Sequence, residues 1–340
     1  MESTTAGLAL LIIAGIANAS FALPMKFTRK WAWENTWLVF SILALVVLPV
    51  ITTFATVPAL GSVYREAGAR IVTEVALFGA GWGVAQVLFG LAIDAIGIAL
   101  AFSIVLGLSA ALGSLIPLIW LHSEKVFAPA GFADIGGVIL VIAGVTVCAV
   151  AGRKRERSQA TPAARTSNSS FGRGLALALI SGICAALMNF GIAFGGPLIS
   201  AAARLGSKPQ WTINAVWLPL MTAGAVPNLV YCVHLIRRNR SADNFSQSTT
   251  GSYWLLALIM AVFWLGSTLL YGIASTKLGA LGPAVGWPLF MSLIVITASL
   301  LGVFTGEWKN TGMKPLAIQL SGVVILVVAV VILSRASLYV

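Results

Sequence analysis

Ten apolar segments, each about 20 residues long, account for most of this 340-residue chain. A helix needs about 20 apolar residues to cross the hydrocarbon layer of a bilayer, so each segment is long enough to span a membrane. The mean hydropathy is +0.97 and only 9% of residues are charged, against roughly 25% in a soluble domain. We therefore predict an all-α integral membrane protein. The segments lie at residues 6–25, 36–56, 72–92, 97–121, 132–151, 173–194, 211–235, 253–273, 280–303 and 316–334.

The first and sixth segments open with nearly the same ten residues. Gly7–Ile16 reads GLALLIIAGI and Gly174–Ile183 reads GLALALISGI, with seven identical positions and no gap. Each copy opens a set of five segments, and because five is odd, the second set crosses the membrane in the opposite direction. We therefore predict two inverted five-helix repeats, an architecture of secondary transporters in which the substrate site lies between the halves near the bilayer midplane.

The match between the halves continues along the chain. Trp82 aligns with Trp264, 182 residues on, and Trp31 with Trp211, 180 residues on. The offset rises from 167 to 180 between the sixth and seventh segments, which indicates an insertion of about 13 residues there. We predict a first repeat over 1–152, a basic linker over 153–172 and a second repeat over 173–340.

Of the 21 Lys and Arg residues, 14 lie in the connections after the first, fifth, seventh and ninth segments, and this distribution predicts the orientation. Basic loops stay in the cytoplasm, so we predict a bacterial inner-membrane protein with both termini outside. This distribution accounts for the net charge of +11 and gives no reason to expect nucleic acid as a partner. The basic residues of these connections are Lys26, Arg29, Lys30, six residues within 153–173, Arg237, Arg238, Arg240, Lys309 and Lys314.

The sequence has no phosphate-binding loop, no His-Glu-x-x-His pattern and no Cys-x-x-Cys pair. We therefore expect no enzyme, no metal and no cofactor other than a coupling ion, with transport driven by a gradient. The spacings Gly79-x-x-x-Gly83 and Gly191-x-x-x-Gly195 predict close helix packing. Five tryptophans near segment ends are expected mainly to anchor the protein at the membrane interface: Trp31, Trp33, Trp37, Trp211 and Trp308.

Polar and aromatic residues inside the segments are the candidate substrate-binding residues, because such groups are costly in lipid and face the interior or a cavity. Trp82 and Trp264 are favoured because they lie deeper in their segments than the other tryptophans and recur at matching positions. For Gln86 and Asn189, a hydrogen bond between helices is the alternative. No Lys or Arg lies in the middle of a segment, which disfavours an anionic substrate. Neutral amides with aromatic faces suit a neutral polyhydroxyl ligand, and a drug or an aromatic amino acid is the alternative, because carriers of these also use aromatic pockets. The candidates are Asn18, Trp82, Gln86, Asn189, Trp264, Tyr271 and Trp287.

Proton coupling requires a titratable group that can reach the site. Of the acids that we place near the membrane (Glu34, Glu74, Asp94, Glu124 and Glu307), Asp94 and Glu34 are the candidates. The alternative for Asp94 is a solvated carboxylate in the turn between the third and fourth segments. The alternative for Glu34 is a favourable charge at the N-terminus of a helix.

Several motifs resemble the bacterial L-rhamnose–proton symporters. They are KFTRKWAWENTW at Lys26–Trp37, LFGAGWG at Leu77–Gly83, Phe89-Gly-Leu91, Gly97, and Glu307-Trp-Lys-Asn310 followed by Gly312 and Pro315. The resemblance implies the drug/metabolite transporter fold, with ten helices in two inverted halves. It also implies proton-coupled uptake of rhamnose or a related deoxysugar through a cavity lined by the first, third, fourth, sixth, eighth and ninth segments.

The leading hypothesis is a proton-coupled symporter of L-rhamnose or a related neutral sugar that works by alternating access. An exporter or facilitator of another small solute, without proton coupling, is the alternative. A membrane sensor is disfavoured because no loop could hold a soluble output domain. The expected partners are a small neutral sugar and the lipid bilayer; the oligomeric state is open, and a monomer is compatible with the sequence.

Overall fold

The structure is a computed structural model that describes residues 2–96, 98–159, 171–279, 282–304, 306, 308, 309 and 311–336. Within these residues, ten helices or groups of helices are long and apolar enough to cross a membrane. They are α1 (Glu2–Ser20); α2 (Trp33–Ile42), the π-helical η2 (Leu43–Val47) and α3 (Leu48–Thr56); α5 (Ala69–Ile96); α6 (Ile98–Leu121); α7 (Pro129–Gln159); α8 (Phe171–Ala185), α9 (Leu187–Phe194) and α10 (Gly196–Arg204); α11 (Asn214–Asn239); α12 (Gly251–Lys277); α13 (Gly282–Phe304); and α14 (Met313–Ala336). Shorter elements are η1 (Leu23–Phe27), α4 (Leu60–Ala67), η3 (Ser123–Lys125), η5 (Pro209–Trp211) and η6 (Ala242–Ser246).

In the described residues, all ten predicted segments are helical over most of their length. The sixth is broken between α8 and α9, and the other differences lie at the segment ends. The sixth is followed by an extra helix, α10, at the place where the repeat offset predicts an insertion. Arg204 of α10 forms an ion pair with Glu66 of α4, with 2.6 Å between Nε and Oε1. Helix α7 continues to Gln159, beyond the predicted start of the linker at residue 153, and the 160–170 part of the linker lies outside the described residues.

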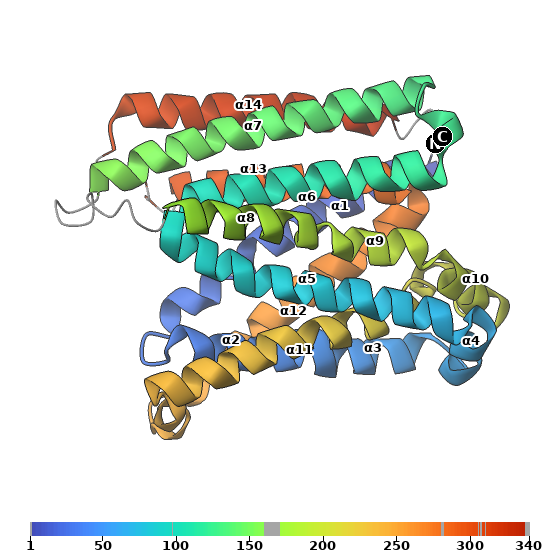
Figure 1. Ribbon diagram of the computed structural model, residues 1–340, viewed down its shortest axis with the longest axis horizontal. Helices are drawn as coiled ribbons and strands as arrows, with labels where there is room; N and C mark the ends of the chain where they lie inside the picture. Colours follow the sequence, from blue (N-terminus) through green and yellow to red (C-terminus); the bar gives the residue numbers. More distant parts are fainter. Residues whose placement is uncertain are drawn as a thin grey trace.

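The long helices lie roughly parallel to one another (Figure 1). Helices α7 and α14 form one edge of the bundle, and α11 with α2 and α3 forms the opposite edge. Both chain termini lie at the same end, as an even number of crossings requires. We call this the termini end, and the opposite end, where α7 finishes and α8 begins, the linker end.

The contacts between helices come in matched pairs. Helix α1 packs on α12 and α13, and its counterpart α8 packs on α5 and α6. The last helices of the two sets, α7 and α14, pack on each other. Helix α1 also runs from the termini end to the linker end, and α8 runs the other way (Figure 1). A two-fold relation between the halves would produce this pattern, and the inverted repeat remains a prediction.

Glycines bring α5 and α11 into close contact, as the Gly79-x-x-x-Gly83 spacing predicts. A Cβ atom at Gly79 would meet the carbonyl oxygen of Leu220, and one at Gly83 would meet that of Gly224. Gly191 of α9 faces the Leu220 side chain in the same way. The absence of side chains at these positions lets the helix backbones approach each other.

Prolines inside the helices release carbonyl groups for contacts between helices. A proline has no N–H, so the carbonyl four residues earlier loses its helical partner. Pro117 in α6 releases the carbonyl of Gly113, and Pro219 in α11 releases that of Ala215. The Tyr64 hydroxyl donates to the Ala215 carbonyl oxygen at 3.3 Å. Burial raises the pKa of Tyr64, so this phenol stays neutral and can donate.

Candidate functional site

Two tryptophans from the two halves of the chain meet in the middle of the bundle. Trp82 of α5 and Trp264 of α12 stack with 5.6 Å between ring centroids and 26° between ring planes. Phe40 of α2 packs edge-on against Trp264, with 6.1 Å between centroids. Both tryptophans are largely buried. The structure thus brings together the two residues that recur at matching positions in the sequence.

Polar groups beside this pair are available to a ligand. The indole N–H groups of Trp82 and Trp264 and the side-chain amide of Gln86 make no hydrogen bond to any part of the chain that the structure describes. Gln86 lies one helical turn from Trp82 and is half-buried. Asn18 is also half-buried, and its amide donates to Ser267 Oγ at 2.8 Å. The group therefore combines aromatic surface with neutral hydrogen-bonding groups.

The other three candidates form a separate cluster. Asn189 of α9 donates to the carbonyl oxygens of Gly113 and Pro283 at 2.6 and 2.9 Å. Its Oδ1 accepts a 2.6 Å hydrogen bond from the Tyr271 hydroxyl. Tyr271 packs edge-on against Trp287, and the Trp287 indole N–H donates to the carbonyl oxygen of Ser109 at 2.9 Å.

This second cluster holds α6, α9, α12 and α13 together. Asn189 and Tyr271 are 0% exposed and Trp287 is 3% exposed. Both N–H groups of the Asn189 amide are occupied by protein carbonyls, one of which Pro117 has released. In this conformation, Asn189 forms hydrogen bonds between helices, which is the alternative to sugar binding given above for this residue. Tyr271 lies two turns from Trp264 along α12, so the cluster covers the tryptophan pair on the termini side.

The packing is divided on the linker side. Trp82, Trp264 and Tyr271 belong to one continuous apolar core. Nearer the linker end, α5, α6 and α8 share a separate small cluster rich in alanine, and α2 and α12 share another built on Trp31, Val39 and Ala257. Gln86 and Phe89 are only half-buried in this region. The main core also reaches the linker side through Phe40, so the difference between the two sides is that Tyr271 is fully buried whereas Gln86 is half-buried.

At the linker end, the Glu34 side chain connects the first turn of α2 to the end of α11 and to the connection that follows it. Its Oε1 accepts hydrogen bonds from Asn239 Nδ2 at 2.9 Å and Ser241 Oγ at 2.8 Å. Neighbouring Asn35 donates to the Ser241 carbonyl oxygen, and the Trp31 indole donates to that of Asn244. The KFTRKWAWENTW segment thus binds the connection between α11 and α12. The side chain of Asp94, the other predicted proton carrier, lies outside the described residues.

One buried acid is missing from the sequence-based candidates. Asp134 of α7 is 0% exposed, and its Oδ2 accepts a 2.8 Å hydrogen bond from Ser114 Oγ of α6. It lies inside the predicted segment 132–151, near its start. An ionisable residue within an apolar segment is itself a signal of function, and this signal could have identified Asp134. Among the described residues, no group of three His, Cys, Asp or Glu could hold a metal ion.

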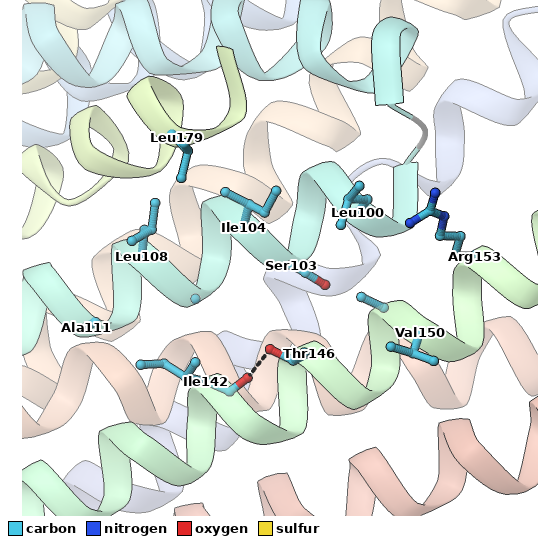
Figure 2. Close-up of a pocket in the computed structure, with 12 residues that line it drawn as sticks. Leu100, Ser103, Ile104, Leu108, Ala111, Ile142, Thr146, Val150, Arg153 and Leu179 are labelled. Atoms are coloured by element: carbon cyan, nitrogen blue, oxygen red, sulfur yellow. Dashed lines mark hydrogen bonds between the residues drawn. The ribbon is translucent and has the colours of Figure 1, made fainter. Parts of the chain in front are cut away.

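A groove of about 340 Å³ lies between α6, α7 and α8 (Figure 2). Its lining is mostly aliphatic, and Arg153 stands at its linker end. The Thr146 hydroxyl in the wall donates to the Ile142 carbonyl of its own helix at 2.7 Å. None of the predicted site residues lines the groove, and its apolar walls do not fit a sugar.

Comparison with known proteins gives a consistent result. A family model described as L-rhamnose-proton symport protein (RhaT) matches residues 1–337. The chain is 29% identical over 324 residues to the L-rhamnose-proton symporter of Mannheimia succiniciproducens, with 93% of each chain covered. It is 27% identical over 335 residues to the symporters of that name from Cronobacter sakazakii and Klebsiella pneumoniae, with 96% of each chain covered. The ten apolar helices or groups of helices in the described part of the chain fit a multi-pass membrane protein, and the chain belongs to the L-rhamnose-proton symport family, a family of transporters and not of enzymes.

Proposed function

We propose that this protein takes up L-rhamnose or a related neutral deoxysugar together with protons, by alternating access, across the bacterial inner membrane. Membership of the symport family supports the substrate class and the coupling ion. The observation that carries the proposal is the Trp82–Trp264 pair, in which both indole N–H groups are uncommitted among the described residues. Aromatic faces match the C–H surface of a sugar, and neutral donors and acceptors match its hydroxyl groups.

The sugar site that we propose lies beside the tryptophan pair on its linker side. The ring centroids are 5.6 Å apart, and a sugar between two rings would need about 3.5–4 Å on each side, so the sugar contacts the outer faces of the pair. Gln86 and Asn18 bond its hydroxyl groups. The cluster of Asn189, Tyr271 and Trp287 closes the site toward the termini end and contacts sugar only after it rearranges.

Alternating access requires a second conformation that opens at the other end. In the conformation described here, Tyr271 on the termini side of the tryptophan pair is fully buried, and Gln86 on the linker side is half-buried. We propose that this is the state that opens toward the linker end. If the basic linker end is cytoplasmic, as the distribution of Lys and Arg indicates, both termini are periplasmic and this state faces the cytoplasm.

The proton carrier also belongs to the proposal. Asp94 and Glu34 remain the sequence-based candidates. The hydrogen bonds from Asn239 and Ser241 favour the charged form of Glu34 in this conformation. For Glu34 to carry a proton, the junction between α2 and the connection after α11 would have to open during transport.

Uptake by purified protein in liposomes tests the function. We expect labelled L-rhamnose to accumulate when the outside is more acidic than the lumen, and we expect a protonophore to prevent accumulation. Uptake that ignores the imposed pH gradient would favour a facilitator over a symporter. If no gradient gives any L-rhamnose uptake, the sugar assignment is wrong, and a screen of neutral sugars by thermal shift would find the substrate, since ligands stabilise the folded state that binds them.

A further inference from the structure

The carboxyl group of Asp134 is held in an unusual environment between α6 and α7. Its side chain is fully buried, and only Oδ2 has a hydrogen bond, with Ser114 Oγ at 2.8 Å. Oδ1 is buried and has no partner among the residues that the structure describes. Buried polar atoms are nearly always paired, so an exception inside a membrane-spanning segment calls for an explanation.

The surroundings offer Asp134 no compensating positive charge. Helix α7 packs against α6, α13, α14 and η3, and neither α6 nor α13 carries a titratable side chain. Near this end of the bundle the described charged or titratable groups on the packed elements are His122, Glu124 and Lys125 in or beside η3, and Arg335 near the end of α14. Glu124 and Arg335 are exposed, His122 and Lys125 are half-buried, and no hydrogen bond joins any of them to Asp134 in the described structure.

A carboxylate in this position would be buried with one neutral hydrogen bond and no cation, which is costly. Binding a proton removes that cost. The neutral acid can donate its O–H to Ser114 Oγ across the same 2.8 Å distance. The positions of the two oxygen atoms fit a hydrogen bond in either direction, and the protonation state decides which group donates. Oδ1 then becomes an ordinary carbonyl oxygen, which tolerates burial better than a charged one.

Helix α6 connects Asp134 to the cluster that closes the proposed sugar site. Ser114 follows Gly113, whose carbonyl, released by Pro117, accepts the hydrogen bond from Asn189. One turn earlier, the Ser109 carbonyl accepts the hydrogen bond from Trp287. A shift of this part of α6 would therefore change the contacts of Asp134 and those of the closing cluster at the same time.

We propose that Asp134 is the proton-binding residue of the transport cycle. It accepts one proton from the termini side on its carboxylate when the protein opens toward that end, and it stays neutral while α6 and α7 are packed as seen here. It releases the proton toward the linker side, the side on which the sugar leaves, when α6 and α7 shift apart after sugar release and before the protein reopens toward the termini end. The inference rests on the proposed function and adds the residue that couples the proton to the sugar. It also differs from the sequence-based candidates, Asp94 and Glu34.

Two transport assays on the full-length protein separate coupling from sugar translocation. Exchange of labelled for unlabelled L-rhamnose across the liposome membrane requires no net proton movement, whereas accumulation driven by a pH gradient does. Asp134→Asn mimics the protonated acid, so we expect exchange within about twofold of the wild-type rate and accumulation at least tenfold lower. Asp134→Glu keeps a titratable group and should retain part of the accumulation. Asp243→Asn, a change of the same kind in exposed η6, is the matched control and should keep both activities.

Normal accumulation by Asp134→Asn would overturn the assignment. So would loss of exchange in Asp134→Asn when its thermal stability equals that of the wild type. A third contradicting result is retained exchange with reduced accumulation in Glu34→Gln and not in Asp134→Asn. If Asp134→Asn fails to fold, the affinity of Asp134→Glu for L-rhamnose is measured between pH 5 and 9 and compared with that of the wild-type protein. A pH dependence equal to that of the wild type contradicts the proposal, and a shifted pH dependence supports it. Absence of L-rhamnose uptake by the wild-type protein contradicts the proposed function itself and is seen in the same assay.

Discussion

At the scale of single residues, the indole N–H groups separate two kinds of tryptophan. Trp31, Trp37 and Trp287 each donate to an acceptor of the protein. Trp82 and Trp264 make no such bond within the described structure, although they stack on each other. The N–H of Trp217 also lacks a partner there, but this ring is fully buried in the core, whereas Trp82 and Trp264 lie beside the half-buried Gln86. Buried tryptophans usually find a partner for the N–H, so an uncommitted pair is suited to a ligand that brings its own acceptors.

Removing either ring should therefore abolish transport while the protein still folds. For Trp82→Ala and Trp264→Ala we expect L-rhamnose uptake to fall at least tenfold, because the stacking surface and a donor are lost. Gln86→Ala should behave similarly, since its amide is also free to bond a sugar. Trp120→Ala is the matched control, because Trp120 is 76% exposed on α6. Wild-type uptake in all three site variants would remove this site.

We expect Asn189 to contribute mainly to the stability of the fold, whereas Gln86 contributes mainly to sugar binding. Replacement of Asn189 by Ala leaves the Tyr271 hydroxyl and two carbonyl groups without their partner, at about 1–3 kcal/mol for each group left unsatisfied. We expect Asn189→Ala to lower the thermal midpoint of the purified protein clearly, whereas Gln86→Ala leaves it unchanged. Equal midpoints for the two variants would show that the hydrogen bonds of Asn189 contribute little to stability.

The sequence could identify some of these residues and not others. Trp82 and Trp264 are found because they recur at the same place in both halves. Trp31, expected mainly at the membrane interface, is 5% exposed and bonded to Asn244, more than 200 residues away. Contacts across such a distance leave no local pattern. Asp134 stands in an apolar segment, but only the structure shows that one of its oxygens has no partner.

At the scale of helices, glycine spacing decides how closely the elements pack. Gly79 and Gly83 of α5 lie directly against the backbone of α11. Gly90 lies on the same helix, and a Cβ atom there would meet nothing within 4 Å. Gly79 and Gly90 can therefore be compared within one helix, because Gly79 contacts a neighbouring helix and Gly90 does not.

A methyl group at Gly79 should separate α5 from α11. We expect Gly79→Ala to destabilise the protein by about 1–3 kcal/mol, the usual cost of overpacking, and to impair uptake because Trp82 lies on the same helix. Gly90→Ala should be neutral or stabilising by about 0.5–1 kcal/mol, since alanine favours a helix. Thermal unfolding in detergent measures both changes, and equal effects would contradict the close contact.

Helix positions follow from the sequence better than helix ends do. Each apolar segment is long enough for a bilayer crossing, so its helical state is strongly determined. The ends are not, because helix α7 can continue through polar residues to Gln159 once it leaves the apolar region. The sixth segment breaks between α8 and α9 without a Gly or Pro at the break, whereas Gly195, Gly196 and Pro197 mark the boundary between α9 and α10 in the local sequence.

At the scale of the whole molecule, five segments per half constrain the architecture more than any single contact. The described residues form ten helices or groups of helices that are long and apolar enough to cross a membrane, as predicted, and both chain ends lie at one end of the bundle. The family membership agrees with the motifs that resemble rhamnose symporters. The sequence does not determine the conformational state, because opposite ends of one bundle can open with the same helices and the same polar pattern.

The orientation in the membrane follows from the basic loops and can be measured directly. We expect a reporter that is active only in the cytoplasm to be inactive when it is fused to the C-terminus. The same reporter inserted into the 160–170 linker should be active. An active C-terminal fusion would reverse the orientation and place the described conformation on the outward-opening side of the cycle.

Sugar-dependent proton movement tests the central claim most directly. Proteoliposomes with equal pH on both sides are suspended in a weakly buffered medium, and the external pH is followed as L-rhamnose is added. A symporter predicts that the medium becomes more alkaline as protons enter with the sugar, and that a protonophore removes the signal. L-rhamnose uptake with no change in external pH would contradict proton coupling.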